Sequence, residues 1–568
     1  MRKGIRAYSA LVLAGAMALG TAVPAFAEET TEADDSASTC NWEPFAETVE
    51  LQIPVYDRGV EGVPDVTNNY WTNWIQENFG DKYNIHVTYV PITRTDVMTS
   101  YSLLAAAGDL PTVLEEYDYP KVTQWANDGY MRTFDMEEFA EVAPTYYKQM
   151  TDNGLDQYSQ MGGETYFVAA FRPNYNTEYT FQNFVRMDWL REVGYDHVPV
   201  TRDEYVDAMT KIMDAGICEH PGGGSMVTGV GSDQNYDYRE WPLDEEEWAM
   251  YGDYNIPSLG WEPNKKVLYY ANQDYNNGIT DPEYYLIDSE QAKTNFINGK
   301  SYMYSTYTSA TMDWLTAFYE TNPDAELAIK PVVTATDPTT GQTPAYRIDN
   351  PFGMLIGFAN DATDDEMKAA WMYMEWLIQP DNLFTFQWGI EGENFNYDEN
   401  GLPVTVSDYD GEYKQGYNNN KDYWSIIKEG RQAGSMEDQI SAMLPHNLKQ
   451  DFTEDVVEYF NTKSAVAEAG WGIPNAMYSV TIEAESEYQQ TLVELYKSLR
   501  DELTMCSPEE FDAKYEEAAQ EYMDAGYAEV IEERKEAYEA GNSTKLPNTE
   551  AGEIQLEDAT EAEETTAE

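Results

Sequence analysis

Alternating and periodic hydrophobic positions along the chain predict its first secondary-structure elements. Residues 49–55 alternate as in a half-buried strand, and residues 70–79 carry aromatic and aliphatic side chains at helical spacing. A second strand is predicted over 85–90, followed by a helix over 96–107 that ends at Gly108. Strand, helix, strand and helix in this order predict a parallel sheet covered by helices, and therefore an α/β fold.

The same criteria predict further elements along the chain. A strand is expected over 164–170, and a helix begins after Thr201, because Thr followed three residues later by Glu204 forms a capping box. Residues 218–285 lack such periodicity and are expected to be rich in loops. Amphipathic helices are predicted over 363–379, 482–500 and 508–534. With 568 residues, the chain is long enough for two domains or lobes.

The N-terminal 27 residues have the pattern of a secretory signal peptide. Three basic residues precede an almost wholly apolar run over 8–23, and Ala25 and Ala27 then occupy the two small-residue positions of a cleavage site. The alternative is an uncleaved membrane anchor, but the run is shorter than the about 20 residues that span a bilayer. We therefore expect a secreted, extracellular protein, for which ATP and nicotinamide cofactors are unexpected ligands.

Both ends of the expected folded body are acidic and poor in large apolar residues. Residues 28–47 are predicted to form a flexible tether, and residues 538–568 a disordered tail. A lipid anchor at Cys40 is an alternative means of holding the protein at the cell surface. Five acidic residues separate Cys40 from the apolar run, however, which is unlike a lipoprotein cysteine. The three cysteines show neither a disulfide framework nor metal-ligand spacing, so no cofactor or metal is predicted.

The balance of charge excludes some partners. The chain has 103 acidic and 34 basic residues and a formal net charge of −69. Such a surface repels phosphate backbones and anionic lipids, which excludes nucleic-acid binding as a main role. It also argues against an anionic uronate ligand unless basic residues gather at the binding site. We expect a soluble monomer.

Four separated segments of the chain carry recognisable motifs. They are residues 103–113 (LLAAAGDLPTV), 185–201 (VRMDWL, then Gly194 and PVT), 278–300 (GITDPE, then FINGK) and 388–395 (WGIEGENF). Their order and spacing resemble the extracellular solute-binding proteins of ABC importers. The last segment is similar to an oligosaccharide-binding branch that includes alginate-oligosaccharide binding proteins and lipoproteins of Gram-positive bacteria.

This resemblance implies two α/β lobes joined by a hinge, with the ligand in a cleft between them, as in periplasmic binding proteins. Lobe 1 would hold residues 48–165 and a returning part of about 310–400. Lobe 2 would hold residues 166–309 and about 401–537. The implied function is capture of a carbohydrate, an oligosaccharide in particular, and its delivery to an ABC permease in the membrane.

A secreted carbohydrate-active hydrolase is the alternative function. Such an enzyme needs two carboxylates on either side of a glycosidic bond, and a chain this acidic always offers a pair. No hydrolase motif and no eightfold strand–helix repeat is present in the sequence. The sequence therefore favours a binding protein over an enzyme.

One departure from the resembling proteins concerns calcium. The alginate-binding relatives carry an acidic calcium loop, but the corresponding residues 216–224 lack the alternating Asp and Asn ligands. Asp233, Asn235 and Asp237 have ligand spacing, yet no glycine occupies the required turn and position 12 is Asp244 rather than Glu. A bound metal is therefore not expected.

The candidate ligand-binding residues are polar or aromatic side chains in loops or in the family motifs. Aromatic residues make up 14% of the chain; their flat rings pack on the C–H faces of sugars, while carboxylates and amides bind the hydroxyls. For any single aromatic residue, packing in the core is the alternative role. The expected stacking residues are Trp71, Trp241, Trp314 and Trp388. The expected polar residues are Asp57 and Arg58 after the first strand, Asp109 after Gly108, and Glu391 and Asn394 in the last motif.

Overall fold

The structure, a computed structural model, describes most of the chain from residue 40 to residue 555. The gaps are 60–63, 174–180, 224–237, 240–243, 254, 309–311, 313, 337–342, 349, 407–420, 432, 444–448 and 547–549. The expected signal peptide, most of the expected tether and the end of the acidic tail lie outside the described residues. Within them, no helix combines the length and the apolar composition that crossing a bilayer requires.

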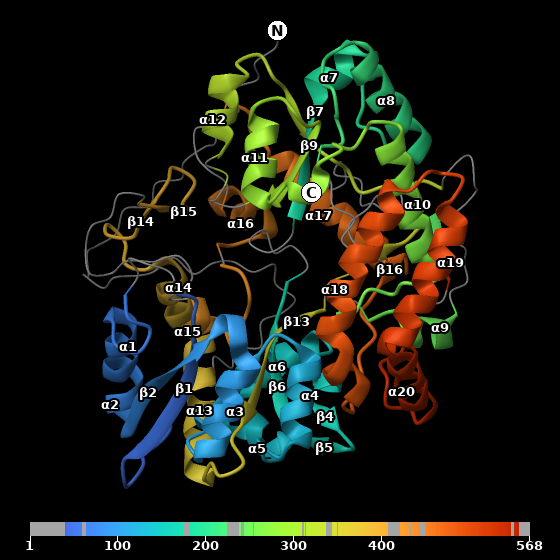
Figure 1. The fold of residues 1–568 in the computed structure, drawn as a ribbon. Coiled ribbons are helices and arrows are strands. Elements are labelled where there is room, and N and C mark those ends of the chain that lie inside the picture. The colour runs from blue at the N-terminus through green and yellow to red at the C-terminus, as the bar shows by residue number, and fades with distance from the viewer. Residues whose placement is uncertain are drawn as a thin grey trace.

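Lobe 1, the lower part of Figure 1, is built on two small sheets. β1 (Val49–Asp57) pairs in parallel with β2 (Ile85–Thr93) along its whole length. β13 (Phe352–Phe358) lies between β3 (Val113–Glu116) and β6 (Phe167–Phe171) and is antiparallel to both. The helices of this lobe are α1 (Tyr70–Ile75), α2 (Asp81–Tyr83), α3 (Val97–Ala107), α4 (Tyr119–Asn127), α5 (Met136–Val142), α6 (Pro144–Asp152), α13 (Asp364–Ile378), α14 (Pro380–Trp388) and α15 (Lys421–Ser425).

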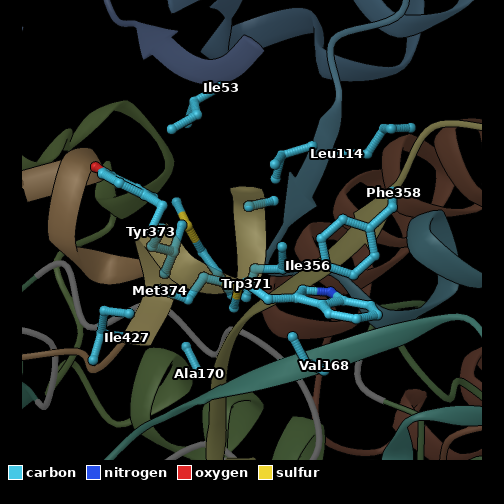
Figure 2. Close-up of a cluster of buried hydrophobic side chains, with 14 of the residues drawn as sticks. Ile53, Leu114, Val168, Ala170, Ile356, Phe358, Trp371, Tyr373, Met374 and Ile427 are labelled. Atoms are coloured by element: carbon cyan, nitrogen blue, oxygen red, sulfur yellow. The ribbon is translucent and has the colours of Figure 1, made fainter. Parts of the chain in front are cut away.

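The centre of lobe 1 is helix α13, which confirms the helix predicted over 363–379. Thr363 and Glu366 form a capping box: the Glu366 carboxylate accepts from the Thr363 amide at 2.7 Å, and Thr363 Oγ1 accepts from the Glu366 amide at 3.3 Å. The helix is buried along almost its whole length because sheet residues and helices surround it. Figure 2 shows Trp371 beside Phe358, with ring centroids 6.1 Å apart.

Lobe 2, the upper part of Figure 1, is organised around an antiparallel sheet in which β7 (Phe181–Arg186) lies between β9 (Met303–Tyr307) and β10 (Leu327–Ile329). One face of the sheet packs on a cluster around Phe184, and the other on a cluster around Val185. The covering helices are α7 (Met187–Glu192), α8 (Arg202–Asp214), α10 (Glu262–Asn276), α11 (Ser289–Ile297), α12 (Trp314–Thr321), α16 (Met436–Met443) and α17 (Thr453–Glu468).

The C-terminal helices form a further layer on the right of Figure 1: α18 (Glu483–Met505), α19 (Phe511–Tyr522) and α20 (Ala528–Glu539), packed on α9 (Glu245–Tyr251) and α10. The helix predicted over 508–534 is thus two helices, because the chain turns at Gly526, whose φ is +118°. The remaining short elements are β4 (Gln160–Met161), β5 (Glu164–Thr165), β8 (Tyr238–Arg239), β11 (Thr343–Pro344), β12 (Tyr346–Arg347), β14 (Phe395–Tyr397), β15 (Pro403–Thr405) and β16 (Gly472–Ile473).

The packing of residues 310–400 differs in part from the expected lobe boundaries. Trp314 and Leu327 pack with Phe184 in the core of lobe 2, and the chain rejoins the core of lobe 1 at Phe352. β13 is buried at all seven positions, so it can only be a central strand. In the other direction, Tyr423 of α15 packs in the core of lobe 1, although residues after about 401 were expected in lobe 2.

Candidate ligand-binding site

The first three strands of lobe 1 end at one edge of the lobe. Gln52 donates its amide proton to Thr112 Oγ1 at 3.2 Å, and Tyr56 Oη donates to the Glu115 carbonyl at 2.9 Å, so β1 and β3 run in the same direction. β2 is parallel to β1. Open α/β sheets bind ligands outside the carboxyl ends of their strands, which makes this edge the candidate site in lobe 1.

Arg58, which follows β1, forms an ion pair with Asp422 at the start of α15. Its Nη2 lies 3.0 Å from Asp422 Oδ1, and its Nη1 contacts the other carboxylate oxygen. The Asp422 side chain is fully buried, whereas Arg58 is 18% exposed. Burial disfavours the charged guanidinium, but hydrogen bonding and charge attraction from Asp422 outweigh it and raise the pKa of Arg58. Arg58 is therefore at the expected edge, held by a partner far away in the sequence.

A second arginine at this edge, Arg94, directly follows β2 and contacts Glu116 at the end of β3. Its Nη1 lies 3.6 Å from Glu116 Oε2, and its guanidinium lies 4.8 Å from the centroid of the Tyr56 ring. The Arg58 guanidinium lies 5.5 Å from the same centroid. Tyr56 Oη also lies 3.2 Å from Glu116 Oε2, to which it can donate. Charged and aromatic groups from three strands thus form one connected network.

The segments that connect the lobes meet beside this edge. Phe171, at the end of β6, donates its amide proton to the Ile427 carbonyl at 3.2 Å and accepts one from Glu429 at 2.8 Å. Arg172 donates its amide proton to the Pro351 carbonyl at 2.9 Å, and its side chain is ion-paired with Glu429. Three crossing segments are therefore joined by backbone and side-chain hydrogen bonds.

Two of the predicted acidic residues lie at opposite edges of lobe 1. Asp57 ends β1 at the candidate edge, is exposed, and accepts a hydrogen bond from the Gly59 amide at 2.9 Å. Asp109 precedes β3 and therefore lies at the amino end of that strand, where its amide donates to the Leu104 carbonyl at 3.0 Å. Asp109 was expected to join the ligand site, but it lies at the opposite edge of the lobe.

Three of the predicted stacking residues are packed in hydrophobic cores. Trp71 is 3% exposed and stacks on Phe386 with ring centroids 4.6 Å apart; Trp314 is 4% and Trp388 is 1% exposed. A sugar stacks on an open ring face, whereas these three rings are buried. Their burial contradicts the expectation that they stack on the ligand. Trp241 lies outside the described residues.

The motif around Glu391 forms a turn whose buried residue is structural. Asn394 is 3% exposed, and its Oδ1 accepts the Ile390 amide proton at 2.9 Å. Gly389 has a φ of +88°, and a Cβ placed there would lie 2.3 Å from Asn394 Oδ1. Only glycine therefore fits at position 389. Asn394 was expected to bind the ligand, but its buried side chain stabilises this turn instead. Glu391 is exposed on the turn.

Five residues at this edge carry no motif or spacing that predicts them from the sequence: Tyr56, Arg94, Glu116, Asp422 and Glu429. No local spacing links Asp422 to Arg58, since 364 positions separate them. As to metals, no group of three or more His, Cys, Asp or Glu that could hold an ion is present in the described parts of the chain. Asp233, Asn235 and Asp237 lie outside those parts.

Comparison with known proteins gives one family. The family model described as bacterial extracellular solute-binding protein matches residues 74–386, more than half of the chain. No curated protein sequence gives a significant match.

Solved structures with a similar fold cover most of the chain. They include alginate-binding protein AlgQ2 without calcium ion, with a TM-score of 0.55, 14% identity, and coverage of 87% of this chain and 99% of that chain. FusA of Streptococcus pneumoniae in complex with kestose has a TM-score of 0.52 and 12% identity over 87% and 99%. An HMO-binding solute-binding protein of Bifidobacterium longum infantis has a TM-score of 0.52 and 12% identity over 88% and 100%. The fold is thus that of a two-lobed periplasmic-type binding protein, and the chain belongs to the bacterial extracellular solute-binding proteins.

Proposed function

We propose that this protein binds a neutral oligosaccharide outside the cell and delivers it to the membrane permease of an ABC importer. The family is one of extracellular solute-binding proteins. Several proteins of similar fold carry the names of their carbohydrates, which are alginate, kestose and an N-glycan. The proposal includes secretion after removal of residues 1–27 and action as a monomer.

We propose a neutral ligand because each of three arginines at the candidate edge is paired with a carboxylate. Arg58, Arg94 and Arg172 each contact a carboxylate, from Asp422, Glu116 and Glu429 respectively. Each pair has no net charge, so an anionic uronate gains little attraction there against the −69 charge of the chain. The same pairs present hydrogen-bond donors and acceptors of the kind that sugar hydroxyls use.

The same pairing disfavours the hydrolase alternative at this edge. A glycosidase needs one carboxyl group that carries a proton and a second carboxylate across the glycosidic bond. Asp422, Glu116 and Glu429 are each held in an ion pair with an arginine, so none of them is placed as the unpaired carboxyl group that a general acid requires. We therefore propose binding without turnover.

The proposed mechanism is closure of the lobes on the ligand. The crossing segments at Arg172, Pro351 and Glu429 are hydrogen-bonded together, so the lobes are expected to rotate about this junction. A sugar that contacts both lobes binds the closed form more tightly than the open form and shifts the equilibrium toward it.

Titration calorimetry tests this function directly. The mature chain is titrated with kestose, maltotriose, xylotriose, lacto-N-tetraose and an alginate-derived triuronate, and reducing ends are followed in parallel. We expect at least one neutral sugar to bind, the triuronate to bind weakly or not at all, and no reducing ends to form. Preferred binding of the triuronate would exclude a neutral ligand. Turnover that one Asp or Glu substitution abolishes would favour the hydrolase.

A further inference from the structure

An exposed pair of aromatic rings lies on the sheet of lobe 2. Phe181 begins β7, Tyr307 ends β9, and the two are cross-strand partners. Their ring centroids lie 4.1 Å apart, with an angle of 41° between the ring planes. Phe181 is nevertheless 44% exposed, whereas Phe184, three residues later on the same strand, is fully buried. The first residue of the strand therefore stabilises the core little and keeps part of its ring open to solvent.

The position of this pair follows from the path of the chain. Residue 171 ends the last strand of lobe 1 before the chain enters lobe 2, and β7 begins at Phe181. The start of β7 is therefore the end of the lobe 2 sheet that is directed at lobe 1, and Figure 1 shows β7 rising from there to α7. Because β9 is antiparallel to β7, Tyr307 lies at the same end.

Polar groups continue the same face of the sheet. Alternate residues of a strand point to the same side, so Asn183 follows Phe181 on this face and Ser305 precedes Tyr307. Asn183 and Ser305 are themselves cross-strand partners; Ser305 is exposed and Asn183 is half-buried. The next residue of β7 on this face, Val185, is fully buried in the cluster under α7 and α8. The aromatic pair and its polar neighbours thus occupy the part of the face nearest lobe 1.

We propose that Phe181 and Tyr307 form a stacking platform for one sugar ring of the oligosaccharide, with the Asn183 amide and the Ser305 hydroxyl binding its hydroxyl groups. The C–H face of a neutral pyranose or furanose matches the partly exposed rings, and an amide and a hydroxyl supply donors and acceptors beside them. The start of β7 is the end of the lobe 2 sheet nearest lobe 1, so closure of the lobes would bring the platform and the arginine–carboxylate edge onto one ligand. This inference rests on the proposed carbohydrate-binding function.

Three substitutions in the full mature chain test the platform. Phe181→Ala and Tyr307→Ala each remove one ring, and Phe181→Tyr keeps a ring at the first position. The matched control is Tyr285→Ala, because Tyr285 is also an exposed aromatic residue, 50% exposed, in the turn Tyr284–Leu286 of lobe 2. The probes are kestose, maltotriose, xylotriose and lacto-N-tetraose, and the readouts are calorimetric affinity and melting temperature.

We expect Phe181→Ala and Tyr307→Ala to weaken the best-bound probe by roughly 10-fold to 100-fold, by analogy with the stacking of nucleic-acid bases. Phe181→Tyr restores most of the affinity, and Tyr285→Ala leaves it unchanged. The melting temperature of Phe181→Ala stays close to that of the wild type, since Phe181 is 44% exposed at the first position of its strand.

If the wild type binds a probe and Phe181→Ala binds it equally well, the platform is wrong while carbohydrate binding stands. If Phe181→Tyr is as weak as Phe181→Ala although both melt like the wild type, stacking is not the role of this residue. If the wild type binds none of the probes, both the platform and the proposed function are overturned.

Discussion

Arg172 and Glu429 form an ion pair across two of the segments that connect the lobes. Arg172 Nη2 lies 3.3 Å from Glu429 Oε1, and Arg172 Nε contacts the other carboxylate oxygen. The Glu429 side chain is 3% exposed, whereas that of Arg172 is 25% exposed. Gly353 of β13, next to the third crossing segment, leaves room for this side chain, since a Cβ there would lie 2.8 Å from Glu429 Cγ. The ion pair therefore depends on glycine at that position.

The first prediction concerns the coupling between these two residues. Arg172→Gln leaves a nearly buried carboxylate without its cation, so we expect a loss of about 1–3 kcal/mol in the free energy of unfolding. Glu429→Gln alone has a similar effect, and the double variant loses less than the sum of the two. Urea unfolding of the four proteins measures the coupling.

Asp364→Asn is the control for this cycle, because the Arg132–Asp364 pair is largely exposed, at 31% and 91%. Its effect is expected to stay below about 1 kcal/mol. Strictly additive effects of the Arg172 and Glu429 substitutions would show that the pair does not stabilise the crossing segments.

The second prediction separates folding from binding at Trp388. This side chain is 1% exposed and packs with Phe395 and Met443, so Trp388→Ala is expected to cost about 3–5 kcal/mol of stability. The folded fraction should bind sugar as the wild type does. Phe181→Ala is expected to show the reverse, a near-normal melting temperature with weakened binding. A stable Trp388→Ala protein with weakened affinity would contradict this role and return Trp388 to the binding site.

The sequence predicted secondary structure and motif positions more reliably than it predicted which side chains meet the ligand. Hydrophobic periodicity predicted helix α13, because the residues that form and cap this helix are close together in the sequence. The motif at 388–395 does form a turn, but whether Trp388 faces solvent depends on Phe395 and Met443, which pack on it in three dimensions. Burial of an aromatic residue is decided by such contacts and not by the motif.

Strand direction and long-range pairing account for the other differences. Asp109 lies at the amino end of β3, and only the contacts between β1 and β3 show that this is the edge away from Arg58. The partner of Arg58 is 364 residues away, so no spacing in the sequence predicts it. The one sequence indication at Phe181 is that polar Gln182 and Asn183 follow it, whereas the fully buried strand β13 is apolar throughout.

The third prediction concerns the attachment of the C-terminal helices. Arg534 of α20 is fully buried; its Nε lies 2.6 Å from Glu485 Oε1 of α18, and its Nη2 lies 2.8 Å from Asp253 Oδ2. Arg534→Met leaves two buried carboxylates without their cation, and we expect a loss of about 3–5 kcal/mol.

Urea unfolding measures this loss, and limited proteolysis should show earlier cleavage within α18–α20. Lys535→Met is the control, because the Lys535–Glu246 pair on the same helix is about half exposed, at 46% and 47%. Equal stability of the Arg534→Met protein and the wild type would show that apolar packing alone holds these helices.

The last prediction is a pH dependence that Glu115 causes. The Glu115 side chain is fully buried, and in the described part of the structure neither of its carboxylate oxygens has a hydrogen-bond partner. Burial, together with the charges of Asp422 and Glu116, raises the pKa of Glu115 well above its usual value, although Arg58 acts in the opposite direction. The folded protein therefore keeps this proton at a pH where the unfolded chain has lost it.

The direction of the effect follows from proton linkage. Below the pKa of about 4.3 of an unfolded glutamate, both states are protonated and Glu115 costs nothing through ionisation. As the pH rises above that value, the unfolded state is favoured by up to about 1.4 kcal/mol per pH unit, until the folded pKa is reached. Glu115→Gln keeps the shape of the neutral side chain and removes this loss.

We expect the melting temperatures of Glu115→Gln and the wild type to be close at pH 4 and to separate as the pH rises, with the variant more stable at pH 7.5. Glu116→Gln is the control on the same strand. Since Glu116 contacts Arg94 and lies within hydrogen-bond distance of Tyr56 Oη, its substitution should lower stability at pH 7.5 instead. Parallel melting curves for Glu115→Gln and the wild type between pH 4 and pH 7.5 would show that Glu115 ionises in the fold, and a closer cation than Arg58 would then have to compensate its charge.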